Sequence, residues 1–449
     1  MIAFLLALAV QDSAHLALPG LAERALAQHP AVAAARHARS RAGADQREAR
    51  SALLPRLSLE ASVTQYQEPW LVYPLHGFPT ALPPGGAAPA FDRTLMMAGA
   101  FVGWTLFDFG QRTSRLAAAR ALADAADASS AAAEAAIVAR TAVAYLRTLS
   151  AREIVAAQNQ RLRAIEAEAE RSRRLLAEGT APRLLVLRAD AALARARAEH
   201  SQAAAQLELA EQNLARLTGL QAEALRSATL APVSPADTAA SARLPRVRQQ
   251  LIARAAESSP DVSAARRRAD AARAASAAAR AGRLPELRLQ TGVIDRGAIG
   301  HDFRAEWQAA LTLSFSPYTG GQRSALVARA EADAAIADEQ RRAAELDVSE
   351  AVDRAIAALV EARARAEALT GALEHSASVA AVERTALEVG SGTQPDYLEA
   401  LADVLRDRSA LVEARHAELA ALIELARITG ELSTEWLRTW ISESSPSPS

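Results

Sequence analysis

The residues of this chain that could carry chemistry are its histidines, its carboxylates and two glycine-rich segments. The eight histidines, among them His29 and His200, are scattered without the spacing of metal ligands. GSGTQPD (390–396) lacks the Lys and Ser/Thr of a phosphate loop, and RGAIGHD (296–302) does not lead from a buried strand into a helix, as a dinucleotide site does. Cysteine is absent, which excludes thiol catalysis and disulfides. We therefore expect no enzyme, metal or cofactor site.

The charge and the composition indicate which secondary-structure elements the chain forms. The chain of 449 residues has 52 acidic and 51 basic residues, all of the latter Arg, so no nucleic-acid surface is predicted. Most carboxylates share helix faces with Arg, as in RARAEALTGALEH (363–375), which is typical of solvated or interhelical ion pairs. Aromatic residues make up only 4%, which favours closely packed alanine-rich helices over a core of bulky side chains.

The chain contains one unit written twice. Its landmarks recur at a spacing of 230 residues before the central loop and 211 residues after it. The matched landmarks are Pro30 with Pro260, Pro55 with Pro285, Gly110-Gln111-Arg112 with Gly321-Gln322-Arg323, and Thr218-Gly219 with Thr429-Gly430. The difference falls in the Pro- and Gly-rich segment 68–91 of the first copy, which predicts a loop there, against the short RGAIGHD of the second. An internal repeat of this kind determines the architecture.

These landmarks define the expected domain organisation. We predict a first repeat over 14–219, a linker over 220–245, a second repeat over 246–430 and a partly disordered tail over 431–449. Residues 1–13 begin with a short apolar run, which indicates a secretory signal peptide, although no basic residue precedes the run. The alternative is the start of a buried helix. No segment is long and apolar enough to predict a transmembrane helix.

Each repeat is predicted to contain two strands that follow its first helix. After Pro55 and after Pro285, apolar and polar residues alternate, and the segments from about Leu95 to Phe107 and from Phe303 to Phe315 do the same. A period of two over about ten residues is typical of a tilted membrane-spanning strand. Four strands cannot close a barrel in lipid, where unpaired edges are costly, so several chains would have to share one. The edge of a soluble sandwich is the alternative.

The predicted helices are much longer than those of a globular domain. A stretch without Pro runs from about Asp108 to Ala177, about 70 residues or on the order of 100 Å, and the second repeat has another from Thr319 to Val389. Pairs of shorter helices match these lengths end to end: Ala17 to Ser51, Pro182 to Leu217, Pro245 to Ala281 and Pro395 to Thr429. Long soluble helices must coil around neighbours. At the turns between long and short helices, Gly179 and Gly392 are expected to take positive φ, with Pro182 and Pro395 in the first turn of the next helix.

These features together resemble the TolC-like outer-membrane efflux proteins over nearly the whole chain, from about Leu18 to Gly430. The resemblance rests on the duplicated Leu-Pro strands, the junctions LFDFGQR and PYTGGQR, and EGTAPRLLVLRADAALARA at a helical turn. It implies a mainly α fold with a membrane β-barrel portion: a coiled α-helical tunnel in the periplasm, and four strands per chain in a trimeric twelve-stranded barrel. Gly110, Gln111 and Arg112, with Gly321, Gln322 and Arg323, would mark the barrel-to-tunnel junction.

The resemblance also implies which residues meet partners. An adaptor would contact the helical tips at Glu178, Gly179, Thr180, Pro182, Gly390, Ser391, Gly392, Thr393 and Pro395. A ring of carboxylates would narrow the tunnel just after the second tip, and the candidates are Asp396, Glu399 and Asp403. Such a ring would favour cations. Alternatively, the tip residues only form turns, and the three carboxylates are solvated charges of a helix face.

The function implied is a passive exit duct of a tripartite efflux pump or a type I secretion system, embedded in outer-membrane lipid. Its partners would be two further copies of the chain, a periplasmic adaptor (membrane fusion) protein and an inner-membrane pump of the RND, ABC or MFS type. The alternative from another class is a coiled-coil scaffold protein without a pore. A scaffold has no need of amphipathic strands.

Overall fold

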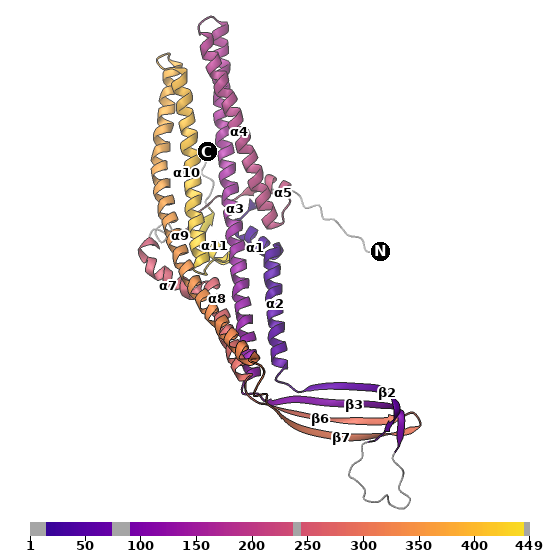
Figure 1. The fold of residues 1–449 in the computed structure, drawn as a ribbon. Helices are drawn as coiled ribbons and strands as arrows, with labels where there is room; N and C mark the ends of the chain where they lie inside the picture. Colours follow the sequence, from indigo (N-terminus) through magenta and orange to yellow (C-terminus); the bar gives the residue numbers. More distant parts are fainter. Residues whose placement is uncertain (1–14, 74–89, 237–243, 444–449) are drawn as a thin grey trace, which may run out of the picture. The chain divides into compact units, whose positions relative to one another are not determined.

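The computed structural model describes residues 15–73, 90–236 and 244–443. It contains long helices and a small sheet, as the sequence predicts (Figure 1). The helices are α1 (Leu18–Gln28), α2 (Pro30–Ser51), α3 (Gln111–Ala177), α4 (Arg183–Thr218), α5 (Ala222–Ser227), η1 (Leu244–Val247), α7 (Arg248–Ser258), α8 (Pro260–Ala281), α9 (Gln322–Glu388), α10 (Gln394–Ile428) and α11 (Thr434–Trp440). The strands are β1 (His15–Leu16), β2 (Arg56–Leu71), β3 (Phe91–Phe107), β4 (Thr229–Leu230), β5 (Val233–Pro235), β6 (Glu286–Ala298), β7 (His301–Ser314) and β8 (Ile441–Glu443).

The two repeats correspond residue by residue. Both long helices have 67 residues, and α9 begins and ends 211 positions after α3. Similarly, α7 and α8 begin and end 230 positions after α1 and α2. The spacings read from the sequence are therefore structural equivalences, and a residue of one repeat can be compared with its counterpart in the other.

The short helix predicted from Ala17 to Ser51 is wrong in one respect: the structure breaks it into α1 and α2 at His29. The same break separates α7 from α8 at Ser259, within the segment predicted as one helix from Pro245. Each break lies directly before a proline, Pro30 or Pro260, and the residue before proline is sterically disfavoured in the α conformation. His29 and Ser259 are extended, with ψ of 127° and 126°.

The four long strands form one antiparallel sheet in the order β2-β3-β6-β7, so the two repeats join through β3 and β6. The strands have 13 to 17 residues and are longer than the ten predicted. Part of the predicted loop is strand, because β2 continues to Leu71 and β3 begins at Phe91; residues 74–89 lie outside the described residues. In the second repeat, β6 and β7 are joined by Ile299 and Gly300 alone, and Gly300 has a φ of +87°.

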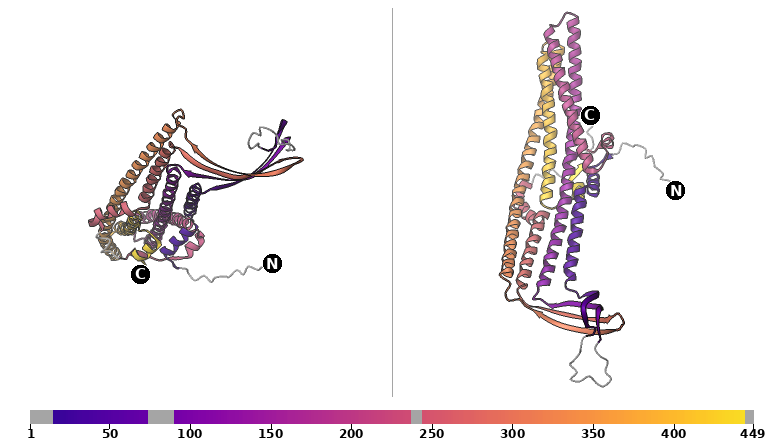
Figure 2. Two further views of the ribbon diagram at one scale, coloured as in Figure 1. Left: turned by 90° about the horizontal axis from the view of Figure 1, so that it is seen from below. Right: turned by 45° about the vertical axis from the view of Figure 1, so that its right-hand side comes forward.

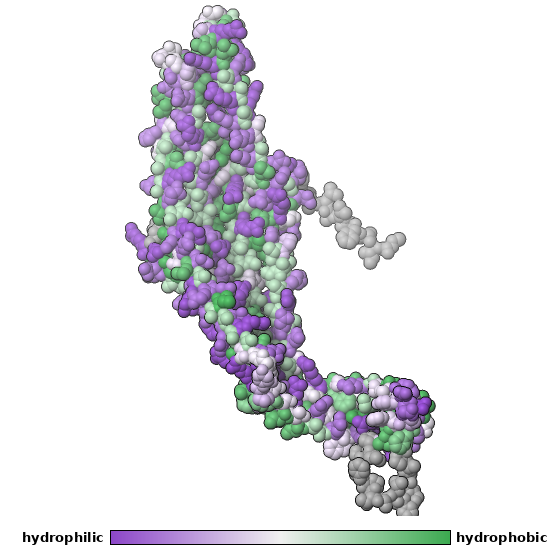
Figure 3. Space-filling view, viewed as in Figure 1, coloured by the Kyte–Doolittle hydropathy of each residue, from purple (hydrophilic) through white to green (hydrophobic). Residues whose placement is uncertain are grey.

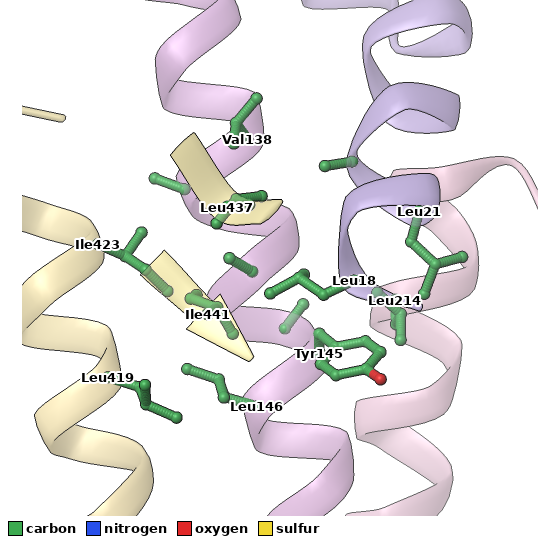
Figure 4. Close-up of a cluster of buried hydrophobic side chains, with 14 of the residues drawn as sticks. Leu18, Leu21, Val138, Tyr145, Leu146, Leu214, Leu419, Ile423, Leu437 and Ile441 are labelled. Carbon is green, nitrogen blue, oxygen red and sulfur yellow. The ribbon is translucent and has the colours of Figure 1, made fainter. Parts of the chain in front are cut away.

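The chain divides into two compact units, each built from both repeats. One consists of Met1–Ala38, Asp127–Ala264 and Arg342–Ser449, and the other of Arg39–Ala126 and Ala265–Arg341. The main core of the first unit surrounds Tyr145, which is fully buried among Leu18, Leu214 and Leu437 (Figure 4). The Tyr145 hydroxyl donates to the carbonyl oxygen of Ala231, at 2.6 Å. The second unit contains the sheet and the helical ends next to it.

The predicted linker and tail carry short elements that complete the first unit. Strand β4 pairs with β1, and β5 pairs with β8. Leu437 of α11 is fully buried, so the tail is ordered through Glu443. The predicted signal peptide lies outside the described residues, as do residues 444–449. Within 15–73, 90–236 and 244–443, no helix combines the length and apolarity needed to cross a bilayer.

Candidate functional site

The sheet presents an apolar face, largely exposed to solvent in the single chain, and a polar face on which Ile294 is buried. Because residues paired across antiparallel strands share a face, the register places Leu59, Ala100, Val293 and Trp307 together. Trp307 is 79% exposed and Leu59 is also 79% exposed. Figure 3 shows large apolar side chains at the surface of the strand region. A soluble sheet would cover such a face.

The polar face differs in content and in packing. It carries Ser58, Gln290 and Gln308, and the ion pair between Arg296 and Glu306, whose nitrogen and oxygen are 3.0 Å apart. The aromatic ring of Phe101 also lies on this face, against the backbone of Gly99 and Gly292. A Cβ on Gly292 would lie 2.7 Å from that ring, so the glycine makes room for it. An aromatic side chain that covers strand glycines in this way stabilises the sheet.

The two Gly-Gln-Arg sequences lie at the strand-to-helix junctions, as predicted. Gly110 and Gly321 have φ of +86° and +84° and precede α3 and α9. The residues before them, Phe109 and Gly320, also have positive φ, of +53° and +59°. Two consecutive left-handed residues produce the sharp turn between strand and helix in both repeats. At Phe109 this backbone conformation is sterically unfavourable, because the residue has a Cβ.

Asp108, which is not among the predicted site residues, holds the first junction together. Its carboxylate accepts hydrogen bonds from the backbone N–H groups of Gly110 and Arg112 and forms an ion pair with the Arg112 guanidinium at 2.8 Å. Burial opposes ionisation of Asp108, but the hydrogen bonds from Arg112 outweigh it and hold the pKa of this carboxyl below its ordinary value. Because Phe109 and Gly110 are left-handed, α3 begins at Gln111 and not at about Asp108 as predicted, and the Asp108 side chain caps its first turn.

The second junction has a hydroxyl where the first has a carboxylate. The counterpart of Asp108 is Thr319, whose hydroxyl accepts from the Arg323 N–H at 3.4 Å. Arg323 donates instead to the carbonyl oxygens of Ser316 and Arg283. The DFGQR segment, with a carboxylate three residues before Gln, was the available signal for the charged junction.

We expect Asp108→Ala to destabilise the protein by about 2 kcal/mol, since it removes a helix cap and leaves Arg112 without its anion. The matched variant Thr319→Ala should cost less than half of that, because it removes one long hydrogen bond. Thermal unfolding followed by helical circular dichroism measures both. Equal losses in melting temperature would show that Asp108 has no special role.

The first helical tip is a regular helix end built on Gly179. The N–H of Thr180 donates to the Leu175 carbonyl at 2.9 Å and that of Gly179 to Leu176 at 3.0 Å, which is the Schellman pattern with Gly179 at φ +75°. The Thr180 hydroxyl donates to the Leu175 carbonyl too. Glu178 is exposed. Pro182 was predicted to lie in the first turn of α4, but it is the N-cap residue and directly precedes the helix.

At the second tip, the left-handed residue is Gly390 and not Gly392, so that prediction is wrong. Gly390 has a φ of +80°, and the N–H of Ser391 donates to the Ala386 carbonyl at 2.9 Å. The spacing of 211 residues equates Gly179 with Gly390 and was the signal for this assignment. Gly392 has a different role: a Cβ there would lie 2.8 Å from the Ala386 Cβ. Pro395 lies in the first turn of α10, as predicted.

The three candidate gate carboxylates follow one side of α10, on roughly the opposite face from Gln394 at 100° per residue. They are not equivalent. Asp396 is hydrogen-bonded to the hydroxyl of the N-cap residue Thr393 at 2.5 Å, and Asp403 forms an ion pair with Arg406 at 2.6 Å. Glu399 is exposed and has no ion pair within the described part of the chain. Of the three, Glu399 is therefore the carboxylate most accessible to a cation in solution.

The structure also brings together Ser150 and His416, which lie 266 positions apart and line an open groove of about 810 Å³. Burial, together with the charge of Arg415, lowers the pKa of His416 to about 4, so the imidazole is neutral near pH 7. A serine nucleophile needs its histidine to be oriented by a third group. In the described residues no carboxylate is hydrogen-bonded to His416, and no cluster of three His, Asp or Glu could hold a metal.

Comparison with known proteins gives one consistent result. A family model described as outer membrane efflux protein matches residues 21–220 and 251–431. The outer membrane efflux protein BepC of Brucella suis biovar 1 (strain 1330) is 25% identical over 372 residues, which cover 80% of this chain and 78% of BepC.

Solved structures share the fold at low sequence identity. The outer membrane protein VceC from Vibrio cholerae superimposes with a TM-score of 0.78 at 20% identity, over 92% of this chain and 96% of VceC. The Campylobacter jejuni CmeC outer membrane channel gives a TM-score of 0.77 at 15% identity, over 93% of this chain and 87% of CmeC. The arrangement of long helices and four strands is thus the fold of known outer-membrane channels.

Proposed function

Because the chain belongs to the outer membrane efflux protein family, we propose that it is the passive exit duct of a tripartite efflux pump or a type I secretion system. Its strands lie in the outer membrane, and its helices reach into the periplasm. A periplasmic adaptor and an inner-membrane pump of the RND, ABC or MFS type complete the system. The pump supplies the energy, because a conduit needs no chemistry of its own.

The observation that carries this proposal is the four-stranded sheet with one apolar face and two free edges, β2 and β7. In lipid the apolar face is favourable, but unpaired edges cost several kcal/mol per backbone group. Since the strands alternate in direction, β7 of one copy can pair with β2 of the next and remain antiparallel. Three copies then give twelve strands, which is the assembly that the family resemblance implies. A coiled-coil scaffold without a pore leaves the apolar face of the strands unexplained.

Reconstitution into planar bilayers tests the proposal. A duct gives discrete current steps whose size is constant from one insertion to the next. A scaffold gives none, and the absence of steps from protein that has been verified as folded would refute the proposal.

The carboxylates of α10 should make this duct selective for cations over anions. We propose that Glu399, with Asp396 beside it, lines the tunnel near the second tip, where three copies place at least three negative charges together. Glu399→Gln should lower the ratio of cation to anion permeability several-fold, because a ring of like charges excludes anions. The measurement is the reversal potential in a salt gradient. Glu374→Gln is the control, because Glu374 is an exposed carboxylate of α9, and it should leave the permeability ratio unchanged. An unchanged ratio in Glu399→Gln would refute the gate.

A further inference from the structure

Within one chain, the two helical hairpins meet at a joint where α10 packs on α3 and α4. Gln394 of α10 is only 3% exposed, and its amide nitrogen donates to the Glu168 carboxylate at 2.8 Å and to the hydroxyl of Ser172. Leu398 packs against a cluster that includes Ile165. Figure 1 shows α9 on the other side of α10 from α3. We call this contact the internal joint.

The repeat provides a second, unfilled copy of the internal joint. With the spacing of 211 residues, α9 corresponds to α3, and α4 corresponds to α10. In this second copy Glu168 and Ser172 become Val379 and Glu383, and Gln394 and Leu398 become Arg183 and Leu187.

The corresponding positions are covered at the internal joint and open on the outer helices. Leu187 is 55% exposed, whereas its counterpart Leu398 is half-buried. Val379 is 52% exposed, whereas its counterpart Glu168 is buried. The same contrast continues along both helices, and the pairs are Leu405 (buried) with Ala194 (exposed), Val412 (buried) with Ser201 (exposed), and Ala157 (buried) with Ala368 (exposed). Since α10 lies between them, α4 and α9 cannot cover each other within one chain.

The chemistry of the two open faces is complementary in the register of the internal joint. As Gln394 reaches Ser172, so Arg183 would stand opposite Glu383, which places opposite charges together. Val379 takes the place of Glu168, beside Arg183, and Leu187, one turn farther along α4, would lie within about one turn of Val379, apolar beside apolar. Within the described part of the chain, neither Arg183 nor Glu383 forms an ion pair. The stripe on α9 continues with small residues that permit close helix packing, namely Ala364, Ala368, Gly371 and Ala372.

We propose that the α4 face of one copy packs on the α9 face of the next copy in the register of the internal joint, with Arg183 paired to Glu383 and Leu187 against Val379. The proposal rests on the proposed function, in which copies share one duct. It also makes the two kinds of joint chemically different: the internal joint is closed by a buried amide, and the joint between copies by an ion pair that salt can screen.

Cysteine crosslinking tests the register, because the chain has no cysteine of its own. In Leu187→Cys/Val379→Cys, a short thiol crosslinker should convert the protein into covalent dimers and trimers on a denaturing gel. Leu187→Cys/Leu346→Cys is the control, because Leu346 is another exposed residue of α9 about 50 Å farther along the helix. It should give no covalent oligomer, and neither should either single variant.

Native mass spectrometry of the same samples separates the two ways to fail. Trimers that form no crosslink in Leu187→Cys/Val379→Cys would overturn this register and leave the proposed function standing. Monomers alone would overturn both. As a second readout, Arg183→Glu or Glu383→Arg should each reduce the trimer fraction about fivefold, and the double reversal should restore it; a double variant as weak as the singles would contradict the pairing.

Discussion

Trp307→Arg is expected to lower the amount of folded protein in the outer membrane more than tenfold. Trp307 lies midway along β7 on the apolar face of the sheet and is 79% exposed in the single chain. An Arg facing lipid near the bilayer midplane costs about 2–4 kcal/mol, and every copy in the assembly carries it. A loss of about 1.4 kcal/mol already corresponds to a factor of ten.

The neighbouring residue provides the control for this experiment. Gln308 follows Trp307 in β7 but points to the polar face, so Gln308→Arg places the same side chain in the aqueous lumen. Its level in the outer membrane should match that of the unaltered protein. Quantitative immunoblotting of separated membranes measures both variants. If the two accumulate equally, the apolar face does not contact lipid.

Glu178→Arg is expected to abolish export and to leave the assembly intact in the membrane. The turn at this tip is formed by backbone groups and by the Thr180 hydroxyl, all of which bond back to the end of α3. The exposed Glu178 side chain takes no part in these bonds, so reversing its charge should not disturb the turn. Any loss of export would then come from the contact with the adaptor, which we place at the tips.

The measurement is the susceptibility of cells to an exported compound, combined with the trimer content of their outer membranes. Glu257→Arg in α7 reverses an exposed charge well away from both tips (Figure 2) and should change neither quantity. Unaltered resistance in Glu178→Arg would refute the adaptor contact at this tip. Reduced trimer content would show that the residue acts on stability instead.

The sequence predicted the fold well because its signals are local and occur twice. The strands follow from alternation after Pro55 and Pro285, and the long helices from stretches without proline. The breaks before Pro30 and Pro260 could have been predicted from the same prolines, and the role of Gly390 from the repeat spacing. In both cases the signal is present in the sequence itself.

Other features depend on tertiary contacts that no local pattern reveals. Gln394, Glu168 and Ser172 meet although more than 220 positions separate the first from the other two. The pairing of β3 with β6, which joins the repeats, is of the same kind. Asp108 is an intermediate case, since a carboxylate just before a helix is a common cap, but its ion pair and burial require the folded junction. The three candidate gate carboxylates illustrate the limit, because similar acidic residues on one face of α10 have different partners.

We propose that copies of this chain contribute their strands to one barrel. The most direct measurement is a cryo-electron microscopy structure of the protein extracted from outer membranes into lipid nanodiscs. We expect three copies in a closed ring, with β7 of each copy hydrogen-bonded to β2 of the next and Trp307 facing lipid. A single chain whose four strands remain separate, with both edges free and both faces in water, would contradict it.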